Sequence, residues 1–393
     1  LRPIRSAIIT AEVAKNQKIK SVYVPAQNAE QAALVTGVDV FPVENLKSLF
    51  LHLKKEKIIK PIDRSSIKNI SHNHKNAPTI DDIYGQEQAK RAIQIAVAGR
   101  HNILLSGPPG SGKTMLAKSL KNLLPALSED EIVEVTKLHS LGEHTIINNP
   151  IVDRPFRSPH HTASRASIIG GGSKVQPGEI SLAHRGVLFL DELLEYPRTV
   201  LESLRQPLED HEITVSRANG KFNFPANFLL VATMNPCPCG FLGDPEKTCI
   251  CSQNQILNYQ KRLSGPLLDR IDLTVSVSRV PHEKLLNNKM STKSQQETFL
   301  SEIHKAYSIQ RDRYKCSYKY NNDISSNNVD KITSISESAK TFLTNAARKL
   351  DLSTRSYFKV IKVSRTIADL EGSTSIETPH IAESLQYRQI SIG

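Results

Sequence analysis

The chain has 393 residues, 39% of them hydrophobic, and its 51 Lys and Arg against 39 Asp and Glu give a net charge of +12. No apolar run approaches the roughly 18 residues that a membrane-spanning helix needs, and the first residues lack the apolar segment of a secretory signal, so we expect a cytoplasmic protein without membrane contact. The charge favours a polyanionic partner such as a nucleic acid, with a solvated basic surface as the alternative.

The first 53 residues alternate between helical and extended patterns, which is typical of a small α/β unit. The expected elements are a helix over Ser6–Ala14, a strand over Ser21–Val24, a helix over Asn28–Leu34, a strand over Val38–Phe41 and a helix over Val43–Leu53. Residues 54–78 are polar, basic and without periodicity, so we expect a linker there. Because the first residue is not Met, we expect the chain to start inside a longer protein.

The most informative stretch is HNILLSGPPGSGKTMLA at residues 101–117, within a nucleotide-binding domain that we expect over residues 79–280. After a helix over Gln86–Val97, the apolar run Ile103–Leu105 predicts a strand that leads into a match to G-x-x-x-x-G-K-[ST], with a helical pattern behind it. Such a loop curls its backbone N–H groups around phosphates, its Lys reaches the β- and γ-phosphates, and its hydroxyl residue holds Mg²⁺. The residues expected to bind ATP are Gly107, Pro108, Pro109, Gly110, Ser111, Gly112, Lys113 and Thr114, with Lys113 as the catalytic cation and Thr114 as a Mg²⁺ ligand.

Two further apolar runs, Val187–Leu190 and Phe228–Val231, predict strands that end in polar residues. Strands separated by helices indicate a parallel sheet, which binds ligands at the carboxyl ends of its strands. After the first run we expect Asp191 to hold Mg²⁺ and Glu192 to orient and deprotonate the attacking water. After the second, we expect Asn235 to hydrogen-bond the γ-phosphate and that water, with a turn-forming role before the next proline as the alternative.

Residues 281–393 are first polar and then helical, so we expect a helical lid domain packed behind the nucleotide site. The helical patterns cover Thr298–Arg313, Ala339–Arg348 and Ser356–Leu370. We expect Arg270, in SGPLLDR, to neutralise transition-state charge at a neighbouring subunit's ATP, and Arg355 to reach the phosphates from the lid. Ordinary surface charge is the alternative for either arginine.

Four of the five cysteines form the pattern C-x-C-x₉-C-x-C. They are Cys237, Cys239, Cys249 and Cys251. Four thiolates at this spacing can close a tetrahedral site for a structural zinc ion, and clustering of this kind in a chain without a secretory signal favours a metal or reduced thiols over disulfides. C-x-C is tighter than the usual C-x₂-C, so a zinc site and four reduced surface cysteines both remain open.

A Gly-rich, cationic segment precedes Asp191 and includes RPFRSPHHTAS at residues 154–164 and GGGSK at residues 170–174. Core packing explains such a segment poorly, because it lacks periodicity. We expect its backbone N–H groups and the side chains of Arg154, Arg157, Arg165 and Lys174 to contact the phosphates of a DNA strand. A purely structural insertion is the alternative.

Together these residues resemble the AAA+ family and, within it, the magnesium-chelatase-like ATPases of the ComM/YifB type. The resemblance covers essentially the whole chain. Its most specific pieces are GQEQAKRA (85–92), GPPGSGKTMLAKSL (107–120), RPFRSPHHTAS (154–164), HRGVLFLDELLEYPR (184–198), LESLRQPLEDHEITVSRA (201–218), NPCPCGFLGDP (235–245), RLSGPLLDRIDL (262–273) and SYFKVIKVSRTIADLEG (356–372). It implies an α/β fold with a P-loop parallel sheet flanked by helices, a C-terminal helical lid and a partial N-terminal domain similar to the Lon protease domain.

The resemblance also implies a function: a hexameric ring that uses ATP and Mg²⁺, an arginine finger acting in trans, and a DNA-dependent ATPase. Its branch-migration helicase activity would aid the integration of transforming DNA by homologous recombination. Residues 1–53 resemble the latter part of the Lon-like domain, and the proteolytic Lys position falls near Thr10. No Ser–Lys dyad can be assembled, so we expect no protease activity. Arg100 departs from the family, whose members commonly carry a small residue there.

Two rival functions remain open. One is a magnesium-chelatase motor subunit that works on a porphyrin-bearing partner. The other is a regulatory ATPase that remodels a protein partner without DNA. The CPCG cluster, the N-terminal unit and the positive charge favour the DNA motor over the chelatase, but acidic proteins would also be attracted by the charge.

Overall fold

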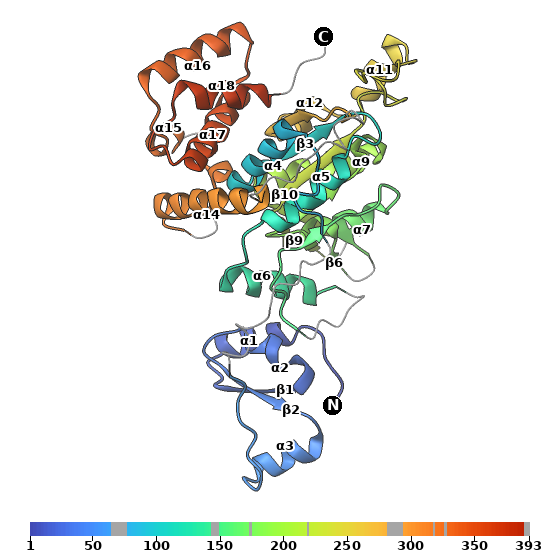
Figure 1. Cartoon of the computed structure of the whole chain (residues 1–393). Coiled ribbons are helices and arrows are strands. Elements are labelled where there is room, and N and C mark those ends of the chain that lie inside the picture. The colour runs from blue at the N-terminus through green and yellow to red at the C-terminus, as the bar shows by residue number, and fades with distance from the viewer. Residues whose placement is uncertain are drawn as a thin grey trace.

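The structure is a computed structural model that describes residues 1–63, 77–142, 149–172, 175–217, 220–280, 294–316, 319–325 and 328–388. A small N-terminal unit lies at one end of an elongated molecule, a parallel sheet with its helices lies in the middle, and the C-terminal helices lie at the other end (Figure 1). None of the helices in these ranges is long and apolar enough to cross a membrane.

The central sheet has five parallel strands in the order β11-β3-β10-β7-β4. Their bounds are β3 Ile103–Ser106, β4 Phe156–Arg157, β7 Val187–Leu190, β10 Leu229–Met234 and β11 Leu273–Ser276. Strands buried on both faces read as continuous apolar runs, which is why the sequence signals at β3, β7 and β10 are strong. The expected α/β fold with a parallel sheet is confirmed.

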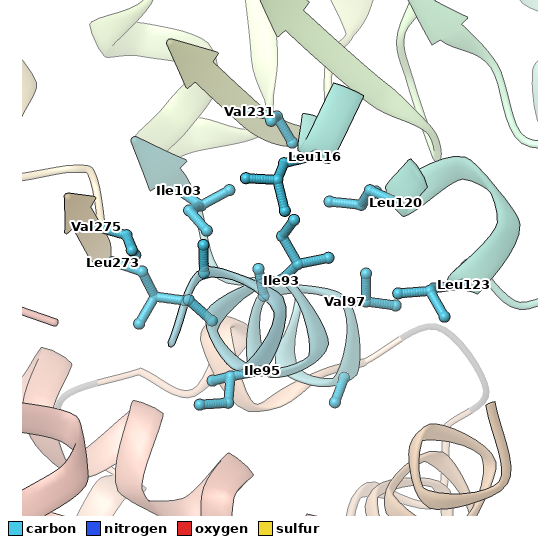
Figure 2. Packing of buried hydrophobic residues seen from close by; sticks show 14 of the residues in the cluster. Ile93, Ile95, Val97, Ile103, Leu116, Leu120, Leu123, Val231, Leu273 and Val275 are labelled. Carbon is cyan, nitrogen blue, oxygen red and sulfur yellow. The ribbon is translucent and has the colours of Figure 1, made fainter. Parts of the chain in front are cut away.

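Alternate residues of these strands enter two separate hydrophobic clusters. Ile103 and Leu105 face α4 (Glu87–Gly99), whereas Leu104 faces the opposite side of the sheet. Figure 2 shows Ile93 of α4 on the side of Leu116, with Ile95 on the other side of the same helix. The helix is therefore buried almost all round, between the sheet and the C-terminal helices.

Short helices and the antiparallel strand pairs β5–β6 and β8–β9 complete the described part of the middle of the molecule. They are α5 (Lys113–Ser119), η3 (Leu120–Leu123), α6 (Glu129–Ser140), α7 (Arg165–Ile169), β5 (Gly170–Gly171), β6 (Gln176–Pro177), α8 (Glu179–Leu182), η4 (Leu193–Glu195), α9 (Arg198–Ser203), α10 (Arg205–Asp210), β8 (Glu212–Arg217), β9 (Gly220–Pro225), α11 (Gln253–Gln260) and α12 (Gly265–Leu268).

The N-terminal unit folds around its own hydrophobic cluster. It consists of α1 (Ala7–Asn16), β1 (Ser21–Pro25), η1 (Ala26–Asn28), α2 (Ala29–Ala32), β2 (Asp39–Val43) and α3 (Leu46–Leu53), with β1 and β2 parallel. It meets the middle of the molecule at α6, where Lys137 pairs with Glu12 at 2.5 Å and the Ser6 hydroxyl donates to the Ser140 carbonyl at 3.2 Å. The expected alternation of helices and strands is confirmed.

The C-terminal helices contribute to two hydrophobic clusters. They are α14 (Gln295–Tyr314), η5 (Asn321–Asp323), α15 (Val329–Ile332), α16 (Glu337–Lys349), α17 (Thr354–Glu371) and α18 (Thr378–Gln386). Ile303 of α14 and Ile367 of α17 belong to the same cluster as α4, whereas α16 and α18 pack around a separate one. The core of the sheet thus continues across residue 281, and the division into residues 1–53, 54–78, 79–280 and 281–393 stays a prediction.

A buried polar contact joins α17 to the start of β3. The His101 ring nitrogen Nε2 lies 2.7 Å from the Thr366 hydroxyl, and both residues are fully buried. Burial, with a smaller effect of the Lys362 charge, lowers the pKa of His101 to about 3. The ring is therefore neutral at physiological pH and serves as a hydrogen-bonding partner between the sheet and the lid.

Candidate functional site

The P-loop, residues 107–114, curls between β3 and α5. Gly112 precedes α5 with φ of +89°, a conformation that favours glycine. The Lys113 ammonium donates to the carbonyls of Gly107 at 2.7 Å and Pro108 at 2.8 Å, and reaches Asn235 Oδ1 at 3.3 Å. Burial lowers the pKa of Lys113, and the Asp191 and Glu192 carboxylates oppose that shift.

Thr114 and Asp191 come together beside the P-loop. The Thr114 hydroxyl lies 3.1 Å from Asp191 Oδ2. A hydroxyl and a carboxylate at this spacing offer the oxygen ligands that Mg²⁺ prefers. The hydroxyl of Ser111, also in the P-loop, is buried without a hydrogen-bond partner, as expected of a loop shaped around a polar ligand. The residues present therefore fit ATP and Mg²⁺.

Two further residues lie beside the acidic pair, a position that the sequence did not predict for either of them. Thr233, fully buried on β10, donates from its hydroxyl to Asp191 Oδ1 at 2.5 Å and accepts from the Glu192 backbone N–H at 3.0 Å. His161 Nδ1 lies 3.9 Å from Glu192 Oε2. The sequence did contain a signal for each residue. Thr233 is a single hydroxyl residue within an apolar strand, and His161 lies just beyond the carboxyl end of a strand, where parallel sheets bind ligands.

The Glu192 backbone itself is unusual. Its φ is +53°, in the left-handed region that glutamate rarely adopts, and its side chain is 55% exposed. Such a conformation persists only where neighbours hold it, and the Thr233 hydroxyl does so here. Glu192 is thus turned towards solvent beside Asp191, as an activator of water requires.

Arg270 and Arg355 lie together, and they share the carboxylate of Glu209 on α10. Arg355 Nη2 lies 2.8 Å from Glu209 Oε1, and Arg270 pairs with the other oxygen. Burial lowers the pKa of Arg270, as do the nearby charges of Arg355 and Arg205. Within the described ranges, neither arginine has a hydrogen bond or an ion pair with residues 107–114. Their roles at the phosphates stay predictions.

The structure brings all four clustered cysteines together. Their sulfur atoms lie within 4.8 Å of one another, with Cys237 at 3.4 Å from Cys239 and 3.6 Å from Cys249. A tetrahedral zinc ion with Zn–S bonds of about 2.3 Å would need sulfurs about 3.8 Å apart. Cys237 is fully buried, and the backbone N–H groups of Phe241 and Ile250 lower the pKa of Cys239 to about 6. The cluster fits a tetrathiolate site.

The cations expected to contact DNA have different surroundings. Arg154 contradicts the expectation: it is 6% exposed, and its guanidinium pairs with Glu131 at 2.9 Å and donates to the Pro125 carbonyl at 2.7 Å. Arg157 pairs with Glu179 at 2.6 Å. Arg165 is exposed at the start of α7. Lys174 lies outside the described residues.

Comparisons with known proteins agree with this geometry. A family model described as "Magnesium chelatase, subunit ChlI" matches residues 79–285, and one described as "Magnesium chelatase, subunit ChlI C-terminal" matches residues 293–388. Competence protein ComM of Haemophilus influenzae is 41% identical over 384 residues, which cover 97% of this chain and 74% of that protein. The chain belongs to the ComM/YifB family of magnesium-chelatase-like proteins.

Other relatives match this chain at lower sequence identity. The YifB protein of Escherichia coli strain K12 is 37% identical over 394 residues, covering 99% of this chain and 75% of that protein. Magnesium-chelatase subunit ChlI of Olisthodiscus luteus is 25% identical over 164 residues, covering 39% of this chain and 49% of that protein. Membership, together with the P-loop and the acidic pair, makes the chain an AAA+-type ATPase that uses ATP and Mg²⁺.

The first prediction concerns Thr233. Thr233→Val removes the hydroxyl that holds Asp191 and the Glu192 backbone, so we expect the turnover of ATP hydrolysis to fall by about 10- to 100-fold, as for other groups that orient a metal ligand. Thr233→Ser keeps the hydroxyl and should retain most of the activity. Equal activity in the valine and serine variants would contradict the role of this hydroxyl.

The second prediction concerns Arg154 and Glu131. Burial raises the pKa of the Glu131 carboxyl, but the Arg154 charge and hydrogen bonds outweigh it, so this pKa lies below its usual 4.5. Arg154→Gln leaves a buried charge unpaired and should lower the free energy of unfolding by about 3–5 kcal/mol.

The sign of the pH effect follows from the lowered pKa. The stabilisation by this pair is complete at neutral pH and is lost as the pH falls through and below about 4.5. Urea unfolding at pH 7 and pH 4 measures both effects, with the exposed Lys340–Glu337 pair, tested as Lys340→Gln, as the control. An Arg154→Gln variant of unchanged stability and weakened DNA binding would restore Arg154 as a DNA contact.

Proposed function

We propose that this chain is an ATP-driven DNA motor that assembles as a hexameric ring and acts as a branch-migration helicase in homologous recombination, including the integration of transforming DNA. The observation that carries the proposal is the convergence of Lys113, Thr114, Asp191 and Asn235 at one edge of the sheet. The likeness to a protein named competence protein ComM over 97% of the chain supports the DNA role. The net charge of +12 suits a polyanionic partner.

Each residue of the site has a task in the proposed hydrolysis. The P-loop N–H groups and Lys113 bind the phosphates, and Thr114 and Asp191 would hold Mg²⁺, which neutralises charge on the phosphate oxygens. Glu192 accepts a proton from the attacking water, and Asn235 orients that water by hydrogen bonding. Thr233 keeps Asp191 and Glu192 in place.

We further propose that Arg270 acts in trans, with Arg355 beside it at the same subunit boundary. Their shared pairing with Glu209, away from the P-loop of their own chain, supports this assignment. Arg157, Arg165 and Lys174 are the proposed DNA contacts of the Gly-rich segment. The four cysteines hold a structural zinc ion in this proposal.

The proposal places the protein in the cytoplasm, where the thiols stay reduced, and gives its N-terminal unit no protease activity. The chelatase subunit is the weaker rival, because the ChlI subunit of Olisthodiscus luteus matches 39% of this chain against 97% for ComM. A regulatory ATPase without DNA is the second rival, and charge alone does not separate it from a DNA motor.

The third prediction tests the DNA role. Steady-state ATP hydrolysis should be stimulated by single-stranded and forked DNA, and Lys113→Ala should abolish it. Lys118→Ala, an exposed lysine on the same helix, is the matched control. Because released counterions drive phosphate binding, the stimulation should weaken steeply with salt. ATP turnover that ignores DNA at low salt would favour a protein or porphyrin partner.

The fourth prediction tests action in trans. Arg270→Ala should lower turnover by about 10³-fold or more, the range known for arginine fingers. Mixing it with Lys113→Ala, which cannot hydrolyse ATP but supplies an intact Arg270, should restore activity above the sum of the two variants. A mixture with no gain, in a sample whose subunits exchange by light scattering and native mass spectrometry, argues that Arg270 serves its own chain.

A further inference from the structure

The four-cysteine loop, residues 237–251, lies directly against the P-loop. At Gly240 a Cβ atom would stand 2.6 Å from Pro109 Cδ and 2.8 Å from Pro109 Cγ, too close for any side chain. Its φ of +84° also favours glycine. The two loops therefore touch without an intervening side chain, and a shift of the four-cysteine loop must move Pro109 or open a gap beside it.

Arg279 contacts both the P-loop and the four-cysteine loop. Its Nη2 donates to the Pro109 carbonyl at 3.2 Å, and its Nε lies 2.9 Å from Oδ2 of Asp244, whose side chain is fully buried. Asp244 also accepts from the backbone N–H of Glu246 at 2.9 Å, which closes a turn in the middle of the loop. One guanidinium thus joins the P-loop to the four-cysteine loop.

The residues just before the four-cysteine loop also contact the P-loop. Asn235, which accepts from Lys113 at 3.3 Å, stands two residues before Cys237. The Gly107 backbone N–H donates to the Met234 carbonyl at 3.2 Å, at the end of the strand that leads into the loop. Two of the four cysteines, Cys237 and Cys239, therefore lie between Asn235 and Gly240, both of which contact the P-loop.

The loop contains no helix or strand of its own. Its conformation depends on the sulfur cluster, on the contacts of Arg279 with Asp244, Glu246 and the Phe241 ring, and on tight turns. The four sulfur atoms lie within 4.8 Å of one another, so one metal ion can bond to all of them. Binding as thiolates releases their protons, and the four metal–sulfur bonds supply the ordering free energy that a loop without a core lacks.

We propose that metal occupancy of the four-cysteine loop sets the affinity of the P-loop for ATP. The proposal rests on the proposed function, in that the loop holds zinc and the P-loop binds ATP. With the metal bound, Gly240 supports Pro109 and Asn235 stays next to Lys113. Without it, the loop leaves Pro109, and the P-loop loses the support that keeps its N–H groups aimed at the phosphates.

The fifth prediction tests this coupling on the whole chain, with zinc and iron contents measured by mass spectrometry and the affinity for a fluorescent ATP analogue measured by titration. We expect about one zinc ion per chain. Cys249→Ser with Cys251→Ser should lose the metal and weaken nucleotide binding by about 5- to 150-fold, the usual range for coupled sites. Cys316→Ser, outside the loop, is the control and should change neither quantity.

Two companion measurements separate coupling from misfolding. Gly240→Ala keeps all four cysteines, so it should retain the metal but still weaken nucleotide binding by displacing Pro109. Wild-type protein stripped with a chelator and returned to a buffer containing Mg²⁺ should show lowered nucleotide affinity and regain it on addition of Zn²⁺, with an unchanged circular dichroism spectrum.

The outcomes distinguish the proposals. Metal-free protein that binds the analogue as tightly as metal-loaded protein overturns the coupling but leaves the zinc site and the ATPase standing. Wild-type protein that contains no metal overturns the zinc site and the coupling together. Metal-loaded protein that binds no analogue overturns both the coupling and the proposed ATP site.

Discussion

The pairing of β10 with β3 on one side and β7 on the other is the constraint on which the candidate site depends. Ala232 lies opposite both Leu104 and Leu190, so the residues that follow the three strands emerge together at one edge of the sheet. Lys113 and Asn235 are far apart in the chain, and no local interaction would join them. A slip of β10 by one residue would turn Thr233 to the other face, away from Asp191.

The parts of the site that could be predicted from the sequence have local signals. VLFL before Asp191 and ILL before the P-loop are apolar throughout because both faces of their strands are covered. The cysteine cluster was predictable for a similar reason, since its spacing is short and regular. The positions of α14, α16 and α17 in the lid were also predictable, from their periodicity, whereas α15 and α18 were not predicted.

Residues whose meaning depends on distant partners could not be predicted. Arg154 has the sequence context of a cation in a Gly-rich loop, but α6 brings Glu131 to it across 23 positions and the pair is buried. Thr233 is one hydroxyl in an apolar strand, and only the strand register sets it beside Asp191. Such contacts follow from tertiary packing, which a motif does not encode.

The lid helices pack on one another and on the sheet partly through polar contacts, and this specifies their geometry. Asp369, fully buried on α17, binds Arg313 of α14 at 2.5 Å and Asn321 at 2.8 Å. His101 contacts Thr366 one turn away on α17. Any other arrangement of these helices would leave buried polar groups without partners, which costs more than displaced apolar contacts alone. The lid is thus fixed in orientation as well as in position.

The carboxylate of Glu209 has a consequence for a ring of the proposed kind. Arg270 and Arg355 already have the Glu209 carboxylate as their counter-ion. In such a ring, a nucleotide bound by the adjacent subunit would compete with Glu209 for these two arginines. A triphosphate offers more negative charge than a diphosphate and competes better. In such a ring, ATP at the adjacent subunit would draw Arg355 and Arg270 away from Glu209 and ADP would let them return, so their pairing with Glu209 would depend on the third phosphate. The half-exposed Glu209 would then help to set the order in which neighbouring subunits of the ring hydrolyse ATP.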